Sequence, residues 1–159
     1  MKKNRMILLL AVVLWLTSSV SAATVDRIAV RSEAMKKEIP VVVIVPDAAK
    51  SGVRMPVLYL LHGYSGDQET WLNVKPSLPQ MADRDSVIVV CPDGENSWYW
   101  DSPLDPASQF ETFVSQEFPD WIDAHYLTIP SREGRAITGL SMGGHGALWT
   151  ALRLSLIHI

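Results

Sequence analysis

The residues best suited to chemistry form a six-residue segment near the C-terminal end of the chain, Gly139-Leu140-Ser141-Met142-Gly143-Gly144. It contains the pattern Gly-x-Ser-x-Gly, which is typical of a nucleophilic serine on a sharp turn between a strand and a helix. Glycines two residues before and after the serine suit such a turn, because strand and helix come so close that a Cβ atom would collide. A chance match in a glycine-containing turn is the alternative. The flanking sequence predicts a strand at 135–140 and a helix at 142–152, so we predict that Ser141 is a nucleophile.

A second segment, His62-Gly63-Tyr64-Ser65-Gly66, directly follows an apolar run and suits the stabilisation of negative charge. Attack by serine on an ester builds charge on the carbonyl oxygen, and a pair of backbone amides can stabilise that charge. We expect the amide of Met142, at the start of its helix, to be one donor. The amide of Tyr64 is the expected second donor, in preference to that of Ser65. The side chain of Ser65 is expected to form a capping box with Gln68 instead.

Three aromatic residues, Trp98, Tyr99 and Trp100, fall in a predicted loop near the carboxyl edge of the predicted sheet. In parallel α/β sheets, ligands bind at the carboxyl ends of the strands, where this loop begins. The three side chains could therefore wall a pocket for an acyl or aryl group. They could equally fill a small core beneath their own loop, because tryptophan and tyrosine serve both purposes.

No histidine in the chain is a good candidate for the base that would activate the serine. His145 is expected to pack beneath the turn, His62 to anchor the loop after its strand, and His125 to end a helix. His158 belongs to the last two residues. Around serine nucleophiles of this pattern, the acid and then the histidine come later in the chain. Since only 18 residues follow Ser141, we expect both partners to lie beyond this sequence.

The elements that must position these residues alternate between strands and helices. Continuous apolar runs at 57–61 and 86–91 predict strands that are covered on both faces. This order predicts a mostly parallel α/β sheet flanked by helices. The other predicted strands are 25–30, 40–45 and 135–140, with a hairpin turn within 31–38, and the predicted helices are 68–72, 79–83, 108–125 and 142–152. Pro119 should kink or split the third helix because it lacks an amide proton.

Residues 1–22 are expected to be a secretory signal peptide, removed between Ala22 and Ala23. Basic residues precede an uncharged apolar run that ends in small residues, and this run is short for a bilayer of about 30 Å. A transmembrane anchor is the rejected alternative. We expect a secreted or periplasmic protein without a stable membrane anchor.

Residues 23–159 are expected to belong to a single domain of acidic character. Loss of Lys2, Lys3 and Arg5 leaves 11 of the 14 basic residues against 17 acidic ones, a charge of about −6, which argues against nucleic acid as a partner. Cys91 is the single cysteine, so no internal disulfide can form, and we expect it to be a small buried side chain at a strand end.

Three segments, "YLLHGYSGDQETW", "VIVVCPDGENSWYWDSP" and "REGRAITGLSMGGHGAL", together resemble the esterase D group of α/β-hydrolases. This group includes S-formylglutathione hydrolases, small-acyl esterases, feruloyl esterases and mycolyltransferase-like proteins. The resemblance covers about residues 28–153. It implies an α/β-hydrolase fold, with Ser141 as the nucleophile, the amides of Tyr64 and Met142 as the oxyanion hole, and neither a metal nor an organic cofactor.

The resemblance implies hydrolysis of short-acyl, acetyl or feruloyl-type esters through an acyl-serine intermediate. Two alternatives remain at this point, acyl transfer to a sugar and a non-catalytic carbohydrate-binding or adhesion protein on the same scaffold. The tail, residues 154–159, departs from the family, which has a polar turn and another strand there. We therefore expect an N-terminal part of a hydrolase domain, truncated after the nucleophile helix and inactive alone.

Overall fold

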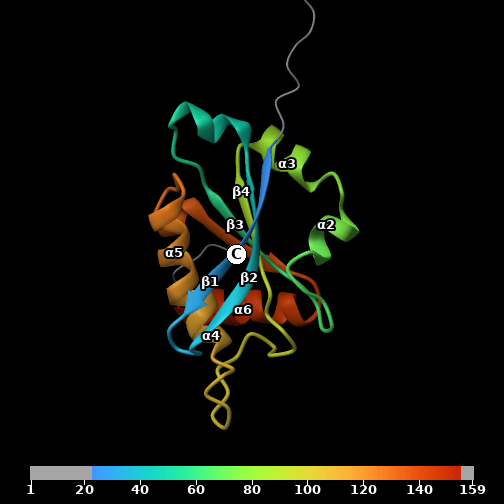
Figure 1. The fold of residues 1–159 in the computed structure, drawn as a ribbon, viewed down its shortest axis with the longest axis vertical. Coiled ribbons are helices and arrows are strands. Elements are labelled where there is room, and N and C mark those ends of the chain that lie inside the picture. The colour runs from blue at the N-terminus through green and yellow to red at the C-terminus, as the bar shows by residue number, and fades with distance from the viewer. Residues whose placement is uncertain (1–22, 155–159) are drawn as a thin grey trace, which may run out of the picture.

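A computed structural model describes residues 23–154, and in it five strands form one mixed sheet in the order β1-β2-β4-β3-β5 (Figure 1). The expected signal peptide and the last five residues of the tail lie outside the described residues. All five predicted strands are confirmed. They are β1 (Thr24–Ser32), β2 (Lys37–Val45), β3 (Val57–Leu61), β4 (Ile88–Pro92) and β5 (Arg135–Gly139).

Strand β3 lies between β4 and β5 and runs parallel to both. The predicted hairpin is also confirmed, because β1 and β2 pair antiparallel from Thr24 opposite Val45 to Ser32 opposite Lys37. Strand β2 then joins β4 in antiparallel fashion. The carboxyl ends of the three parallel strands meet at one edge, and the loops that follow them carry the predicted site residues.

Helices cover both faces of the sheet, as the continuous apolar strands predicted. Helices α2 (Thr70–Val74) and α3 (Leu78–Asp85) pack on one face. A short 3₁₀ helix, η1 (Asp47–Ser51), precedes β3, and its Ala49 contacts the core on the other face. The other face is covered by α4 (Phe110–Thr112), the π-helix η2 (Phe113–Glu117), α5 (Phe118–His125) and α6 (Met142–Leu154). A 3₁₀ turn, η3 (Arg132–Gly134), leads into β5.

Alternate side chains of each strand enter different cores. Val41 and Val43 pack toward α5, whereas Val42 and Ile44 pack toward α3. Cys91 lies in the α3-side core as a free, buried thiol, which confirms its predicted role. Burial raises the pKa of this thiol to about 12, so it stays protonated at neutral pH.

The predicted helix around Pro119 is interrupted by a π-turn but not broken, because the backbone stays helical at Glu117 and Phe118. The π-turn of η2 precedes Pro119, which stands in the first turn of α5, where a missing amide is tolerated. Glu117 ends η2 and accepts hydrogen bonds from the Ser32 hydroxyl, at 2.6 Å, and the Ala34 amide, at 2.8 Å. Glu117 therefore ties this helix to the β1–β2 hairpin.

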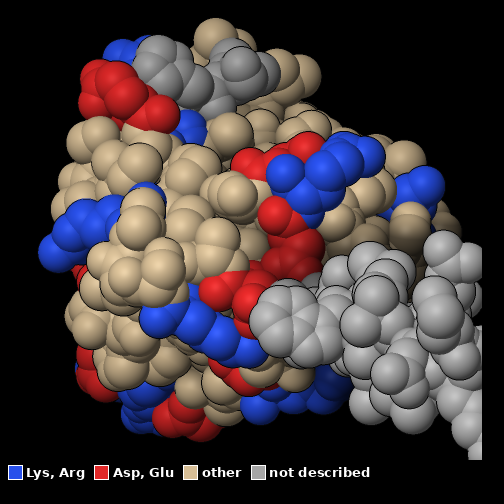
Figure 2. All heavy atoms as spheres, turned by 90° about the horizontal axis from the view of Figure 1, so that it is seen from above, with Lys and Arg blue, Asp and Glu red and all other residues tan. Residues whose placement is uncertain are grey.

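Charged side chains of both signs lie close together on the face shown in Figure 2, without a separate basic patch there. Basic side chains pair with nearby carboxylates, as in Lys50–Asp47 and Arg84–Asp85. Within residues 23–154, no helix has the length and apolar character needed to cross a bilayer.

Candidate active site

Ser141 stands between the end of β5 and the start of α6, with a backbone φ of +54°. This is the left-handed region, which a non-glycine residue adopts only where the surroundings enforce it. Here they do, because strand and helix almost touch. A Cβ atom on Gly139 would lie 2.5 Å from the Gly143 carbonyl carbon, and one on Gly143 would lie 2.4 Å from the Leu61 carbonyl oxygen. The predicted strand–turn–helix setting is present, with the serine exposed at the turn.

The loop after β3 lies directly against this turn. A Cβ atom on Gly63 would be 3.7 Å from the Cβ of Ser141 and 3.3 Å from the Leu140 carbonyl oxygen. The Leu140 amide donates to the Leu61 carbonyl oxygen at 3.2 Å, which fastens the two segments together. The fold therefore brings the peptide that carries the Tyr64 amide beside Ser141 and the start of α6.

The amides of Tyr64 and Ser65 differ in their surroundings. The Ser65 amide donates to Asn96 Oδ1 at 2.8 Å and is therefore occupied.

The expected capping box of Ser65 and Gln68 is wrong, because α2 begins later, at Thr70. The N-cap residue of α2 is Glu69, without a side-chain cap. Before it, Asp67 forms a local turn, in which Oδ1 accepts from the Glu69 amide at 2.9 Å and the Asp67 amide donates to the Thr70 hydroxyl at 2.9 Å.

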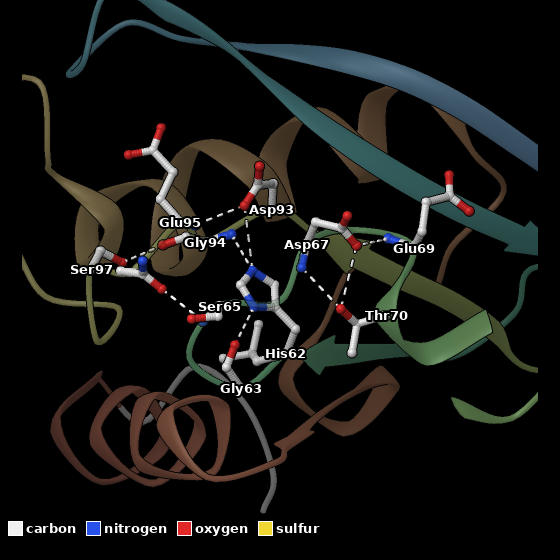
Figure 3. A network of polar contacts seen from close by, with 12 residues as sticks. His62, Gly63, Ser65, Asp67, Glu69, Thr70, Asp93, Gly94, Glu95 and Ser97 are labelled. Carbon is white, nitrogen blue, oxygen red and sulfur yellow. Dashed lines mark hydrogen bonds and ion pairs between the residues drawn. The ribbon is translucent and has the colours of Figure 1, made fainter. Parts of the chain in front are cut away.

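His62 is buried, with 1% exposure, and both of its ring nitrogens are engaged (Figure 3). The Gly94 amide can only donate, so Nε2 accepts from it at 2.8 Å. Nδ1 therefore carries the proton and donates to the Gly63 carbonyl oxygen at 2.7 Å. This tautomer gives His62 an anchoring position and no free nitrogen for proton transfer. Asp93 Oδ1 lies 3.4 Å from Nε2. Burial raises the pKa of Asp93, but its surroundings, including the hydrogen bond that Oδ1 accepts from the Glu95 amide, lower that pKa overall.

The three loop aromatics do not share one environment. Tyr99 is fully buried and fills the space left by Gly94 and Gly146, where an added Cβ would meet its ring at 2.3 and 2.6 Å. Its hydroxyl accepts from the His62 amide at 3.1 Å. Tyr99 thus occupies the core beneath the loop, the second of the two positions that its sequence allowed. Trp98 and Trp100 are 45% and 47% exposed.

The two exposed tryptophans pack edge-on against His145, at ring-centroid distances of 5.6 and 5.1 Å. His145 lies one helical turn after Ser141, and its Nδ1 is 3.3 Å from the Trp98 carbonyl oxygen. Trp149, one turn further along α6, contacts both His145 and Trp100. Sequence reasoning missed Trp149, although its spacing of eight residues from Ser141 places it on the same side of the helix.

Two buried phenols, Tyr59 and Tyr99, predict the alkaline limit of stability. Burial raises the pKa of each hydroxyl above its ordinary value of 10. The unfolded chain releases these protons above about pH 10, whereas the folded chain keeps them. The free energy of unfolding should be unaffected by these groups below pH 10 and fall above it.

The part of the rise in absorbance at 295 nm that is missing in Tyr99→Phe should therefore appear together with loss of circular dichroism. Appearance of that part well before unfolding would contradict this account.

Within residues 23–154, no group of three or more histidine, cysteine or acidic side chains is arranged to hold a metal ion.

Comparison with known proteins places this geometry in context. The model of the family Esterase, described as "Putative esterase", matches residues 32–155. An acetyl esterase from Caldicellulosiruptor saccharolyticus is 37% identical over 99 residues, which are 62% of this chain and 36% of that protein. Among solved structures, an S-formylglutathione hydrolase from Agrobacterium tumefaciens superposes with a TM-score of 0.75 and 28% identity, over 86% of this chain and 56% of that one. A ferulic acid esterase gives a TM-score of 0.74 and 29% identity, over 86% of this chain and 55% of that one.

The chain spans between 24% and 40% of the lengths of the first curated relatives that it matches. Its fold is that of the α/β-hydrolase-type esterases, which confirms the predicted fold class and the family resemblance.

Proposed function

Because this chain belongs to the Esterase family, with the fold of α/β-hydrolase-type esterases, we propose that it is part of a serine carboxylic ester hydrolase whose nucleophile is Ser141. One observation carries this proposal. Ser141 has a strained backbone at a turn that is packed too closely for any Cβ at Gly139 or Gly143. A strained serine on so tightly packed a turn between a strand and a helix is typical of a serine nucleophile.

In the proposed reaction, Ser141 Oγ attacks the ester carbonyl carbon and the carbonyl oxygen becomes an oxyanion. The amides of Tyr64 and Met142 donate to that oxyanion, and the positive end of α6 adds to its stabilisation. Collapse of the tetrahedral intermediate expels the alcohol and leaves an acyl-serine. Water then attacks the acyl-serine, releases the acid and restores the hydroxyl. The acid and histidine of the triad are proposed to lie in the sequence that follows this chain in the full-length protein.

The substrate is proposed to be an acetyl, other short-acyl or feruloyl-type ester. The names of two similar proteins, an acetyl esterase and a ferulic acid esterase, support these classes. Trp98 and Trp100 are proposed to contact the substrate, because they are half exposed and reach His145, one turn from the nucleophile. A flat aryl acyl group would stack on such side chains.

Acyl transfer to a sugar is the second candidate. It uses the same serine and differs in whether an alcohol or water attacks the acyl-serine. Analysis of the products with and without a carbohydrate acceptor separates the two reactions. The N-terminal segment supports a further proposal, that the protein acts outside the cytoplasm, as a secreted or periplasmic enzyme.

A fluorophosphonate probe tests the proposed function in the full-length protein. The probe should label the wild-type protein covalently, and Ser141→Ala should abolish the labelling without loss of fold, because this side chain is exposed. Ser77→Ala is the matched control, since Ser77 is an exposed serine whose side chain caps no helix. A wild-type protein that remained unlabelled would support a non-catalytic binding protein instead.

A further inference from the structure

Two side chains hold the peptide groups on either side of Tyr64. His62 bonds to the group before Tyr64 (Figure 3), and Asn96 bonds to the group after it. The first group joins Gly63 to Tyr64, so it contains both the Gly63 carbonyl and the Tyr64 amide. Its carbonyl oxygen accepts from His62 Nδ1 at 2.7 Å and from the Gly66 amide at 3.0 Å. In a planar trans peptide the N–H points in the opposite direction to the C=O, so fixing this carbonyl also fixes the Tyr64 N–H.

The second peptide group joins Tyr64 to Ser65, and Asn96 fixes it. Asn96 Oδ1 accepts the Ser65 amide at 2.8 Å, from a loop that follows the neighbouring strand β4. With both peptide planes fixed, the backbone angles of Tyr64 are set. The same hydrogen bond occupies the Ser65 amide, which leaves the Tyr64 amide as the available donor in this loop.

The loop that supplies Asn96 is itself firmly placed. The Asp93 amide donates to the Pro40 carbonyl oxygen at 2.8 Å, and the Glu95 amide donates to Asp93 Oδ1 at 2.7 Å. The Ser97 hydroxyl donates to the Gly94 carbonyl oxygen at 2.6 Å, and Lys37 pairs with Glu95 at 2.6 Å. Asn96 therefore extends from a braced turn, whereas Tyr64 lies in an exposed loop.

We propose that Asn96 is a positioning residue of the oxyanion hole, acting through the Ser65 amide to hold the Tyr64 amide in its donating orientation. The proposal rests on the proposed function, because it assigns Tyr64 as an oxyanion donor. Asn96 touches neither substrate nor nucleophile in this role. Preorganised donors stabilise a transition state because they need no reorientation during the reaction.

Substitution in the full-length protein tests the proposal. Asn96→Ala removes the acceptor, and it should lower both kcat for p-nitrophenyl acetate and the labelling rate of Ser141 by about 10²-fold, with KM little changed, as for a displacement of about 1 Å. Asn96→Asp keeps an acceptor oxygen. It should recover part of the rate, since its added charge opposes the oxyanion. Asp105→Ala is the control, because Asp105 makes an equivalent bond to the Ala107 amide in an exposed loop.

Hydrogen exchange at the Ser65 amide, followed by NMR, provides a readout that does not depend on activity. Exchange should be at least about tenfold faster in Asn96→Ala than in the wild type, and close to wild type in Asn96→Asp. Equal exchange in Asn96→Ala and wild type, or a wild-type kcat in Asn96→Ala, would overturn the proposal. Absence of labelling in the wild-type protein would overturn the proposed function, and the exchange data would still decide whether Asn96 holds the loop.

Discussion

Residues 23–159 alone are expected to hydrolyse p-nitrophenyl acetate about 10⁶-fold more slowly than the full-length protein, as for loss of a triad member. The reason lies in the histidines near Ser141. His62 has both ring nitrogens engaged, one by the Gly63 carbonyl and one by the Gly94 amide. His145 directs Nδ1 toward the Trp98 carbonyl and packs among tryptophans.

The measurement compares initial rates of the two proteins at equal concentration, with circular dichroism to establish that the shorter one is folded. Strand β5 pairs only with β3 among the described residues, so aggregation of the shorter protein is also expected. A soluble, folded monomer that turned over the ester at a rate comparable with the full-length protein would contradict the prediction. A base within the chain would then have to be sought.

Gly143→Ala is expected to lower the free energy of unfolding by about 3 kcal/mol, the upper part of the usual range for overpacking. The added methyl group would lie 2.4 Å from the Leu61 carbonyl oxygen and 2.6 Å from that of His62. Both atoms belong to backbone, so neither can turn aside, and α6 would have to move away from β3. Because this movement would displace Ser141, the fluorophosphonate probe should no longer label it.

Gly144→Ala is the matched control in the same helix. Its Cβ would meet the Gly139 carbonyl oxygen at 3.3 Å, a contact that a small shift relieves. Alanine is favoured over glycine within a helix by about 1 kcal/mol, which offsets the cost of this contact. The free energy of unfolding of Gly144→Ala should therefore be close to that of the wild type. Thermal or urea unfolding of both variants measures the difference. Similar stability of the two variants would show that close packing at residue 143 does not determine the turn.

Features that depend on local pattern could be predicted from the sequence. The apolar runs that became β3 and β4 are continuous because both faces of these strands are covered. Pro119 predicted an irregular helix because its missing amide acts within one turn, and a π-turn precedes it. The pattern around Ser141 implied tight packing of strand and helix, and the glycine contacts have that geometry.

Features that depend on contacts between distant segments could not be predicted in the same way. Asn96 meets Ser65 across 31 residues, and no periodicity marks such a pair. Consecutive left-handed residues, Trp98 and Tyr99, turn one aromatic ring outward and the next inward. The predicted start of α2 is too early because Ser65 is a suitable capping residue by type, whereas in the fold its amide bonds to Asn96 and α2 begins at Thr70.

The carbonyl of Leu61 connects helix α2 with the turn that carries Ser141. Its oxygen accepts from the Leu140 amide at 3.2 Å and from the Trp71 indole of α2 at 3.0 Å. Helix α2 belongs to the opposite face of the sheet from α6, the helix that this turn leads into. Two hydrogen bonds to a single oxygen therefore join an indole on one face to the residue that precedes Ser141.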